Sequence, residues 1–218
     1  MYDLLLARFG PQHWWPGDTP FEVAVGAILT QNTNWTNVER AIANLKRARA
    51  LSVRALLALS HADLAALLRP AGYFNVKAMR LRAFLLFLET EYRGSMKRFA
   101  ADPRPDRRAR LLAVKGIGPE TADSILLYAL DEPTFVVDAY TRRILSRHRL
   151  IEPDASYDAI RNLFEDALER DARLYNEYHA LLVACGKRFC RSKMLCSACP
   201  LRPLRRSARL DRSPLTRT

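Results

Sequence analysis

Apolar residues recur every three or four positions along most of the chain, which is the spacing of helices that bury one face. Val38, Ile42 and Leu45 form one such face, and the longest pattern begins near Asn75 and stops before Gly94. The sequence has no Asn-Gly or Asp-Gly turn between alternating residues, and its β-rich segment 134–138 lacks a partner segment. We therefore predict an all-α fold.

Capping residues predict where several of these helices begin. Thr19 precedes a proline at the first helical position, and Glu22 follows three residues later, as in a capping box. The same reasoning predicts helices that start after Thr36, Ser60, Asp106, Gly118 and Asp138, and two further helices over 156–169 and 173–185.

The charge of the chain indicates a partner rich in phosphate. Lys and Arg number 35 against 23 Asp and Glu, a formal net charge of +12. Ten Lys and Arg residues but only one acid follow Gly186, and a second basic cluster spans 104–110. A basic but inert surface is the alternative reading. No apolar run suits a membrane helix and no secretory signal opens the sequence, so we expect a cytoplasmic protein without a membrane partner.

Two glycines stand between predicted helices in the sequence VKGIGPE. Gly116 and Gly118 permit backbone angles closed to other residues and let the backbone approach a ligand closely. The following helix would direct its free N–H groups at that ligand, and Lys115 adds a cation. We predict a helix–hairpin–helix that binds phosphate, although Gly-x-Gly by itself also suits an ordinary tight turn.

All four cysteines fall within 15 residues: Cys185, Cys190, Cys196 and Cys199. A cytosolic chain with this spacing favours a metal site over disulfides. Four thiolates suit either a [4Fe–4S] cluster or a tetrahedral zinc ion.

The segments VKGIGPETADSILLYAL and FVVDAYTRRIL together resemble the helix–hairpin–helix and aspartate signature of the endonuclease III-like (HhH-GPD) superfamily of DNA glycosylases. The resemblance extends to FEVAVGAILTQNTNWTNVERA and spans roughly residues 14 to 200. It implies two helical domains flanking a DNA-binding cleft. One would be a helical barrel over 21–130 with its hairpin at 106–130. The other would combine 1–20 with 131–218, including a cluster loop at 185–199 and a basic tail.

This resemblance implies that Asp138 is the catalytic carboxylate of base excision repair. Cleavage of an N-glycosidic bond builds positive charge on the sugar. A nearby carboxylate can stabilise that charge or orient the water that attacks the sugar. The plain alternative is that Asp138 only caps the next helix, and both roles are compatible. Bifunctional members carry a lysine two residues after the second glycine, where this chain has Glu120. A carboxylate forms no imine, so we expect a monofunctional enzyme without lyase activity.

Within the superfamily, HWWPGD, LTQNTNW and KGIGPETAD resemble the alkylation-repair branch, 3-methyladenine DNA glycosylase III. That resemblance implies a substrate-base pocket formed by Trp35, Trp14 or Trp15, and Glu120, with Gln31 filling the gap left by the flipped base. The remaining DNA contacts are assigned to Lys115, Gly116, Gly118, Lys187, Arg188, Arg191 and Lys193. The expected partner is double-stranded DNA with damaged bases, bound by a monomer.

Two other functions stay open. One is a glycosylase for oxidised or mismatched pyrimidines, and the other is a non-catalytic iron–sulfur protein that binds DNA. The cysteine spacing departs from the superfamily's C-x6-C-x2-C-x5-C, because one cysteine lies upstream at 185 and none follows 199. The resemblance nevertheless favours [4Fe–4S] over zinc, in a structural role.

Overall fold

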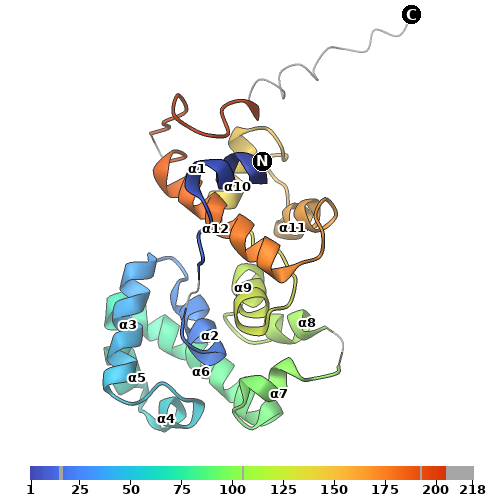
Figure 1. Cartoon of the computed structure of the whole chain (residues 1–218). Coiled ribbons are helices and arrows are strands. Elements are labelled where there is room, and N and C mark those ends of the chain that lie inside the picture. Colours follow the sequence, from blue (N-terminus) through green and yellow to red (C-terminus); the bar gives the residue numbers. More distant parts are fainter. Residues whose placement is uncertain (15–16, 105, 192, 205–218) are drawn as a thin grey trace, which may run out of the picture. The chain divides into compact units, whose positions relative to one another are not determined.

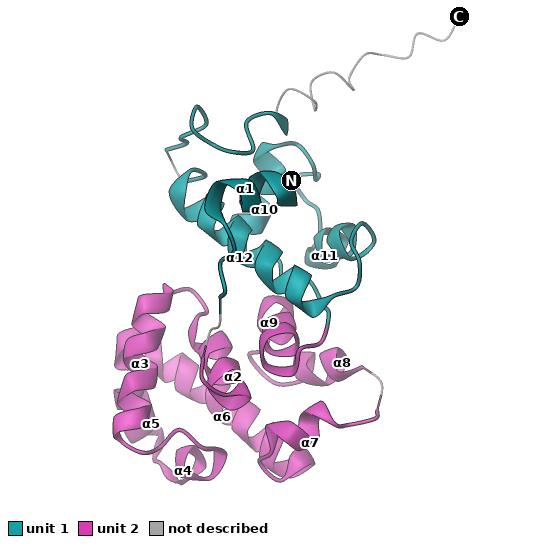
Figure 2. Ribbon diagram, in the orientation of Figure 1, with its two compact units in different colours: residues 1–14, 133–218 teal, residues 15–132 magenta. Residues whose placement is uncertain are grey.

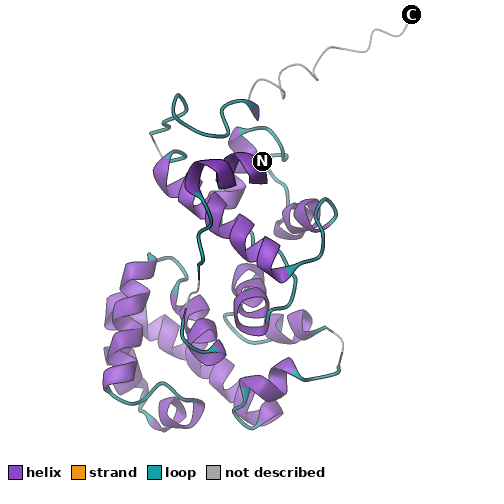
Figure 3. Cartoon of the chain, viewed as in Figure 1, coloured by secondary structure: helices purple, strands orange, loops and turns teal. Residues whose placement is uncertain are grey.

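The computed structural model describes residues 1–14, 17–104, 106–191 and 193–204. Over these residues the chain forms helices joined by loops (Figure 3), and its strand-like pairing is limited to an isolated bridge between Cys190 and Met194. The all-α prediction is confirmed. Among the same residues, no helix is long and apolar enough to cross a membrane.

The chain divides into two compact units (Figure 2). The first unit combines Met1–Trp14 with Pro133–Thr218, and the second is the continuous stretch Trp15–Glu132. The boundaries expected from the resemblance lie at 20/21 and 130/131. The chain thus starts in one unit, builds the other, and returns to the first just before Asp138.

The second unit has a core built around one apolar helix. Its elements (Figure 1) are α2 (Pro20–Leu29), α3 (Trp35–Arg47), α4 (Val53–Ala58), α5 (His61–Leu68), the 3₁₀ turn η1 (Arg69–Ala71), α6 (Phe74–Tyr92), α7 (Met96–Ala100), α8 (Arg107–Leu112) and α9 (Pro119–Leu130). Helix α2 packs against α3, α6 and α9, and Val25, Ile28 and Leu29 on it are fully buried. Because α2 touches both α6 and α9, it connects the barrel-like bundle to the hairpin.

The first unit consists of α1 (Tyr2–Phe9), α10 (Ala139–Arg147), α11 (Tyr157–Glu165) and α12 (Ala172–Arg188). An aromatic cluster fills its core: Phe135 stacks on Phe164 at 3.8 Å between ring centroids, and Tyr175 and Tyr178 meet Phe135 edge-on. Phe135 belongs to the β-rich segment noted in the sequence, which is buried here as a linker and not paired as a strand. This burial fixes the approach of the chain to Asp138.

Most predicted caps are confirmed, and one is wrong. Thr19 accepts a hydrogen bond from the N–H of Glu22, and Ser60, Asp106 and Asp138 cap α5, α8 and α10. The cap of α3 is Asn34 and not Thr36, because the Asn34 side chain accepts from the N–H of Asn37. Trp35 is therefore the first residue of α3. The short helices α1, α4 and α7 were not predicted.

Candidate functional site

The hairpin between α8 and α9 uses its two glycines differently. Gly116 has φ +89°, and an added Cβ would collide with Cγ of Arg80, so this position requires glycine. Gly118 has φ −95° as the N-cap of α9, and nothing lies within 4 Å of a Cβ added there. The prediction that both glycines adopt angles closed to other residues is therefore wrong for Gly118. Its open surroundings leave room for a ligand instead.

The N-terminus of α9 faces outward and lacks a side-chain cap. Lys115, Gly116 and Gly118 are all exposed, whereas Ile117 between the glycines is buried and anchors the turn. Exposed N–H groups at a helix N-terminus, next to a lysine, favour an anion such as phosphate. The geometry of this turn suits the phosphate-binding role predicted for it.

Gln31 ties the end of α2 to the hairpin. Its side-chain amide donates to the carbonyl of Gly116 at 3.1 Å and to Oγ1 of Thr121 at 2.9 Å, and its oxygen accepts from the Arg80 guanidinium. Filling a gap in a DNA stack stays a prediction for Gln31, and it requires these bonds to open. No pattern in the sequence indicates Arg80, because its place beside Gly116 depends on how α6 packs against the turn.

The basic cluster at 104–110 is largely neutralised by nearby acids, which the sequence analysis did not foresee. Arg108 pairs with the fully buried Asp123 at 2.7 Å, and Arg107 pairs with Glu132 at 2.7 Å. Arg104 and Arg110 both pair with Glu91 and with Asp102, the carboxylate between them and Tyr92. Hydrogen bonding by Arg104 holds the pKa of Asp102 well below its usual range, despite the opposing effect of burial. These pairs brace α8 and leave Lys115 as the exposed cation of the turn.

Glu120 is the second residue of α9 and is exposed. It stands at the position where the resemblance places a lysine in bifunctional members. Helix α9 contains no lysine. Another amine of this unit, Lys77 on α6, is 1% exposed and donates to the carbonyl of Ala71 at 2.6 Å. Burial lowers the pKa of Lys77, but its amine is committed to that carbonyl.

Asp138 is the N-cap of α10, and its two carboxylate oxygens have different neighbours. Oδ1 accepts from the N–H of Thr141 at 2.7 Å, while Oδ2 lies 3.7 Å from Nε2 of His179 on α12. The side chain of Asp138 is 13% exposed. Burial by itself raises the pKa of this carboxyl, but His179 and the Thr141 N–H outweigh it, so the pKa lies below its usual value. Asp138 is consequently an anion at neutral pH.

The three tryptophans have separate environments. Trp14 is half-buried in the first unit and stacks on the His179 ring, with centroids 5.6 Å apart and planes at 25°. Trp35 is half-buried in the second unit, where Gly26 of α2 makes room for its ring: a Cβ there would lie 3.1 Å from Cη2 of Trp35. Trp15 lies outside the described residues. The pocket assigned to these residues stays a prediction.

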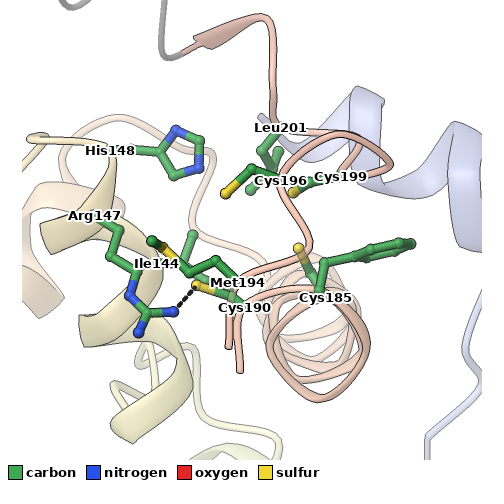
Figure 4. Close-up of a pocket in the computed structure, with 10 residues that line it drawn as sticks. Ile144, Arg147, His148, Cys185, Cys190, Met194, Cys196, Cys199 and Leu201 are labelled. Carbon is green, nitrogen blue, oxygen red and sulfur yellow. Dashed lines mark hydrogen bonds between the residues drawn. The ribbon is translucent and has the colours of Figure 1, made fainter. Parts of the chain in front are cut away.

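The four cysteines line one cavity in the first unit (Figure 4). Cys185 lies in α12, Cys190 follows its end, and Cys196 and Cys199 lie in the loop beyond. The rest of the lining is mostly apolar, and includes Ile144, Phe189, Met194 and Leu201. Hydrogen bonding with Cys199, together with burial, raises the pKa of the Cys185 thiol. Among the described residues, no three His, Cys, Asp or Glu side chains converge enough to hold a single metal ion.

Helix α10 holds the start of the cysteine loop. Arg143 donates to the carbonyl of Cys190 at 2.7 Å, and Arg147 donates to the carbonyl of Arg191 at 2.6 Å and to Sγ of Cys190 at 3.3 Å. The predicted DNA contacts around this loop, Lys187, Arg188, Arg191 and Lys193, are all exposed. Their side chains are therefore available to phosphate, although DNA binding by them stays a prediction.

Two features gave little signal in the sequence. His179 occupies an apolar helix face, where a histidine usually only packs, and its position beside Asp138 emerges from the packing of α12 on α10. Tyr73, immediately before α6, is 67% exposed and has φ 44°, a left-handed angle that is uncommon for an aromatic residue.

Comparison with known proteins gives consistent matches. Residues 25–170 match the HhH-GPD superfamily, described as base excision DNA repair proteins. The chain is 49% identical over 204 residues to the "Putative DNA repair glycosylase MJ1434" of Methanocaldococcus jannaschii, covering 93% of this chain and 92% of the relative.

Two solved structures resemble the fold. The first is the H. pylori 3-methyladenine DNA glycosylase MagIII bound to 1,N6-ethenoadenine, with TM-score 0.72, 31% identity, and coverage of 85% of this chain and 92% of that one. A non-covalent endonuclease III–DNA complex aligns with TM-score 0.81 and 20% identity over 96% of this chain and 94% of that one, which shows a shared fold.

Proposed function

The chain belongs to the HhH-GPD superfamily of base excision DNA repair proteins and is a DNA glycosylase, and we propose that it removes alkylated purines without cutting the strand. The observation that carries this proposal is that the chain has both an anionic Asp138 at the start of α10 and Glu120 at the second position of α9. Asp138 supports hydrolysis of the glycosidic bond, and Glu120 lacks the amine that a lyase needs.

Asp138 is the proposed catalytic carboxylate. As the N-glycosidic bond breaks, electrons leave with the base and positive charge develops on the sugar. A carboxylate whose pKa is held low stays ionised and stabilises that charge, or orients a water toward the sugar carbon. The hydrogen bond from Thr141 fixes the side chain, so little reorganisation is needed when the charge appears.

The proposal that the enzyme does not cut the strand depends on whether an amine can attack the sugar. Strand cleavage by a lyase begins with an amine that forms an imine with the sugar. Glu120 has no amine, and the amine of Lys77 is buried against the Ala71 carbonyl. Lys115 is exposed beside the glycines, where its charge suits phosphate. We therefore expect an abasic site in an intact strand as the product.

Alkylated purines are the proposed substrate because of their charge and leaving-group quality. An N3- or N7-alkylated purine is cationic, and an aromatic face attracts such a base with about 1 kcal/mol or more once water is excluded. Trp14 and Trp35 are both half-buried and present ring surface in their respective units. The 31% identity to MagIII, named as a 3-methyladenine DNA glycosylase, supports this assignment.

The four cysteines are proposed to hold a [4Fe–4S] cluster. Cysteine-only ligation suits it, and the four cysteines line one largely apolar cavity, which fits a cluster held by four thiolates. When bound, the cluster would link the cysteines covalently and hold the loop in one conformation, without taking part in excision. The loop and the end of α12 would then expose four cations to DNA: Lys187, Arg188, Arg191 and Lys193.

A panel of defined duplexes tests the proposal. Each carries one lesion: 7-methylguanine, 1,N6-ethenoadenine, thymine glycol, or a G·T or G·U mismatch; methylated genomic DNA reports release of free 3-methyladenine. We expect excision of alkylated purines, strand breaks only after alkali, and no excision by Asp138→Asn, whose amide still caps α10. Excision confined to pyrimidines would overturn the substrate assignment, and breaks without alkali would overturn the monofunctional one.

A further inference from the structure

The imidazole of His179 lies beside Oδ2 of Asp138, the carboxylate oxygen that takes no part in capping α10. The side chain is 5% exposed on α12, with Nε2 3.7 Å from Oδ2 of Asp138. Oδ1 is already used by the N–H of Thr141, which meets the capping requirement of α10 by itself. The contact between Oδ2 and His179 is therefore not needed to start the helix.

Neighbouring charged side chains on α10 and α12 have partners elsewhere: Arg142 donates to the carbonyl of Ala155, Arg143 donates to the carbonyl of Cys190, and Glu177 accepts from the N–H of Gln12. Trp14 covers the imidazole by stacking on it. The surface of His179 thus faces Asp138 on one side and an aromatic ring on another.

We propose that His179 is a positioning residue for excision: it holds Oδ2 of Asp138 in place, and Trp14 holds the imidazole. This inference rests on the proposed role of Asp138. The 3.7 Å separation between Nε2 and Oδ2 is longer than a hydrogen bond, and such contacts commonly tighten when substrate binds. Nε2–H then donates to Oδ2, which fixes the carboxylate against the charge that develops on the sugar. Trp14 supports the reaction through His179, in addition to any contact with the flipped base.

The plain alternative is that His179 only fills space in the core. Three variants separate the two roles. His179→Ala removes the imidazole, and His179→Gln keeps an N–H donor. Leu181→Ala makes a comparable void at a fully buried position of α12, about 200° around the helix from His179. Excision is measured in single turnover with excess enzyme, on the lesion that the wild type removes fastest. Affinity is measured separately for a duplex with a tetrahydrofuran abasic analogue.

We expect His179→Ala to slow single-turnover excision about 30-fold, which corresponds to about 2 kcal/mol, with affinity for the abasic analogue changed less than about twofold. His179→Gln should recover most of the rate, and Leu181→Ala should lower thermal stability with little effect on excision per folded molecule. Equal slowing by the leucine variant, no recovery with glutamine, or a loss confined to DNA affinity would each show a packing role only.

A spectroscopic measurement does not depend on the activity. In the folded protein, the imidazole NMR resonances of His179 should move in Asp138→Asn relative to the wild type, because the substitution replaces the charged oxygen that lies 3.7 Å from Nε2. Unchanged His179 resonances would overturn the contact. Full excision by Asp138→Asn would instead refute the proposed function, whereas an inactive Asp138→Asn beside a fully active His179→Ala would refute only this inference.

Discussion

Gly118→Ala separates the stability of the hairpin from its binding of DNA. At φ −95° and ψ 178° alanine is unstrained, and nothing lies within 4 Å of the new Cβ. Alanine reduces the entropy of the unfolded chain, which stabilises a protein by about 0.4–1 kcal/mol, while its poorer capping opposes this by a similar amount. We expect the free energy of unfolding to stay within about 1 kcal/mol of the wild type.

The effect on DNA should be much larger. The added methyl group occupies the open space in front of the α9 N-terminus, where the hairpin is expected to receive a phosphate. Charge-assisted hydrogen bonds contribute about 1.5–3 kcal/mol each, so displacement of one N–H contact should raise Kd by about 10- to 100-fold. Fluorescence anisotropy with an undamaged duplex measures this, and thermal unfolding of the same sample reports stability.

Gly116→Ala provides the contrast within the same turn. Its φ of +89° strains alanine, and the Cβ would collide with Arg80, which must move and give up its contact with Gln31. This variant should lose stability as well as affinity, so it reports less clearly on DNA contact. If Gly118→Ala bound undamaged duplex as tightly as the wild type, the α9 N-terminus would not be the phosphate site, and the reasoning from the hairpin would be refuted.

Salt dependence, covalent trapping and absorbance test the remaining assignments. Lys115→Ala should reduce the slope of log affinity against log salt by about one, and an unchanged slope would place the exposed lysine away from DNA. Borohydride should trap no covalent adduct between wild-type protein and lesion DNA, since Glu120 stands at the imine position; efficient trapping would reveal another attacking amine. Protein purified without oxygen should absorb broadly near roughly 400 nm, and Cys199→Ser should lose that band and thermal stability; colourless protein with one bound zinc would contradict the cluster.

The sequence was sufficient for the features that depend on local chemistry. Thr19, Ser60 and Asp138 are N-caps as predicted, because capping needs only a side-chain oxygen and the next three residues. The same local reasoning failed at Thr36, where the equally suitable Asn34 lies two residues earlier and makes the cap. Short helices such as α4 and α7 contain too few turns to show a period, and tertiary packing stabilises them.

Contacts between residues that are far apart in the sequence could not be predicted from it. The arginines of the 104–110 cluster looked like a DNA-facing patch, but their acids come from α6, α9 and the loops at 102 and 132, which no spacing rule brings together. His179 is far from Asp138 in the sequence and reaches it only because α12 packs on α10. Gly186 permits that packing, since a Cβ there would collide with the ring of Tyr140.

Helix α10 links the two chemically distinct parts of the first unit. Its N-cap is Asp138, while Arg143 at its middle and Arg147 at its other end bind the backbone of the cysteine loop. A nine-residue helix rises by about 14 Å, so the cysteines lie well outside the reach of the carboxylate. A stiff helix nevertheless transmits displacement over that length, and α12 carries both His179 and Cys185 along a second route. Ligation of the cysteines would therefore fix the ends of both helices, and with them the relative placement of Asp138 and His179, without any part in the chemical step.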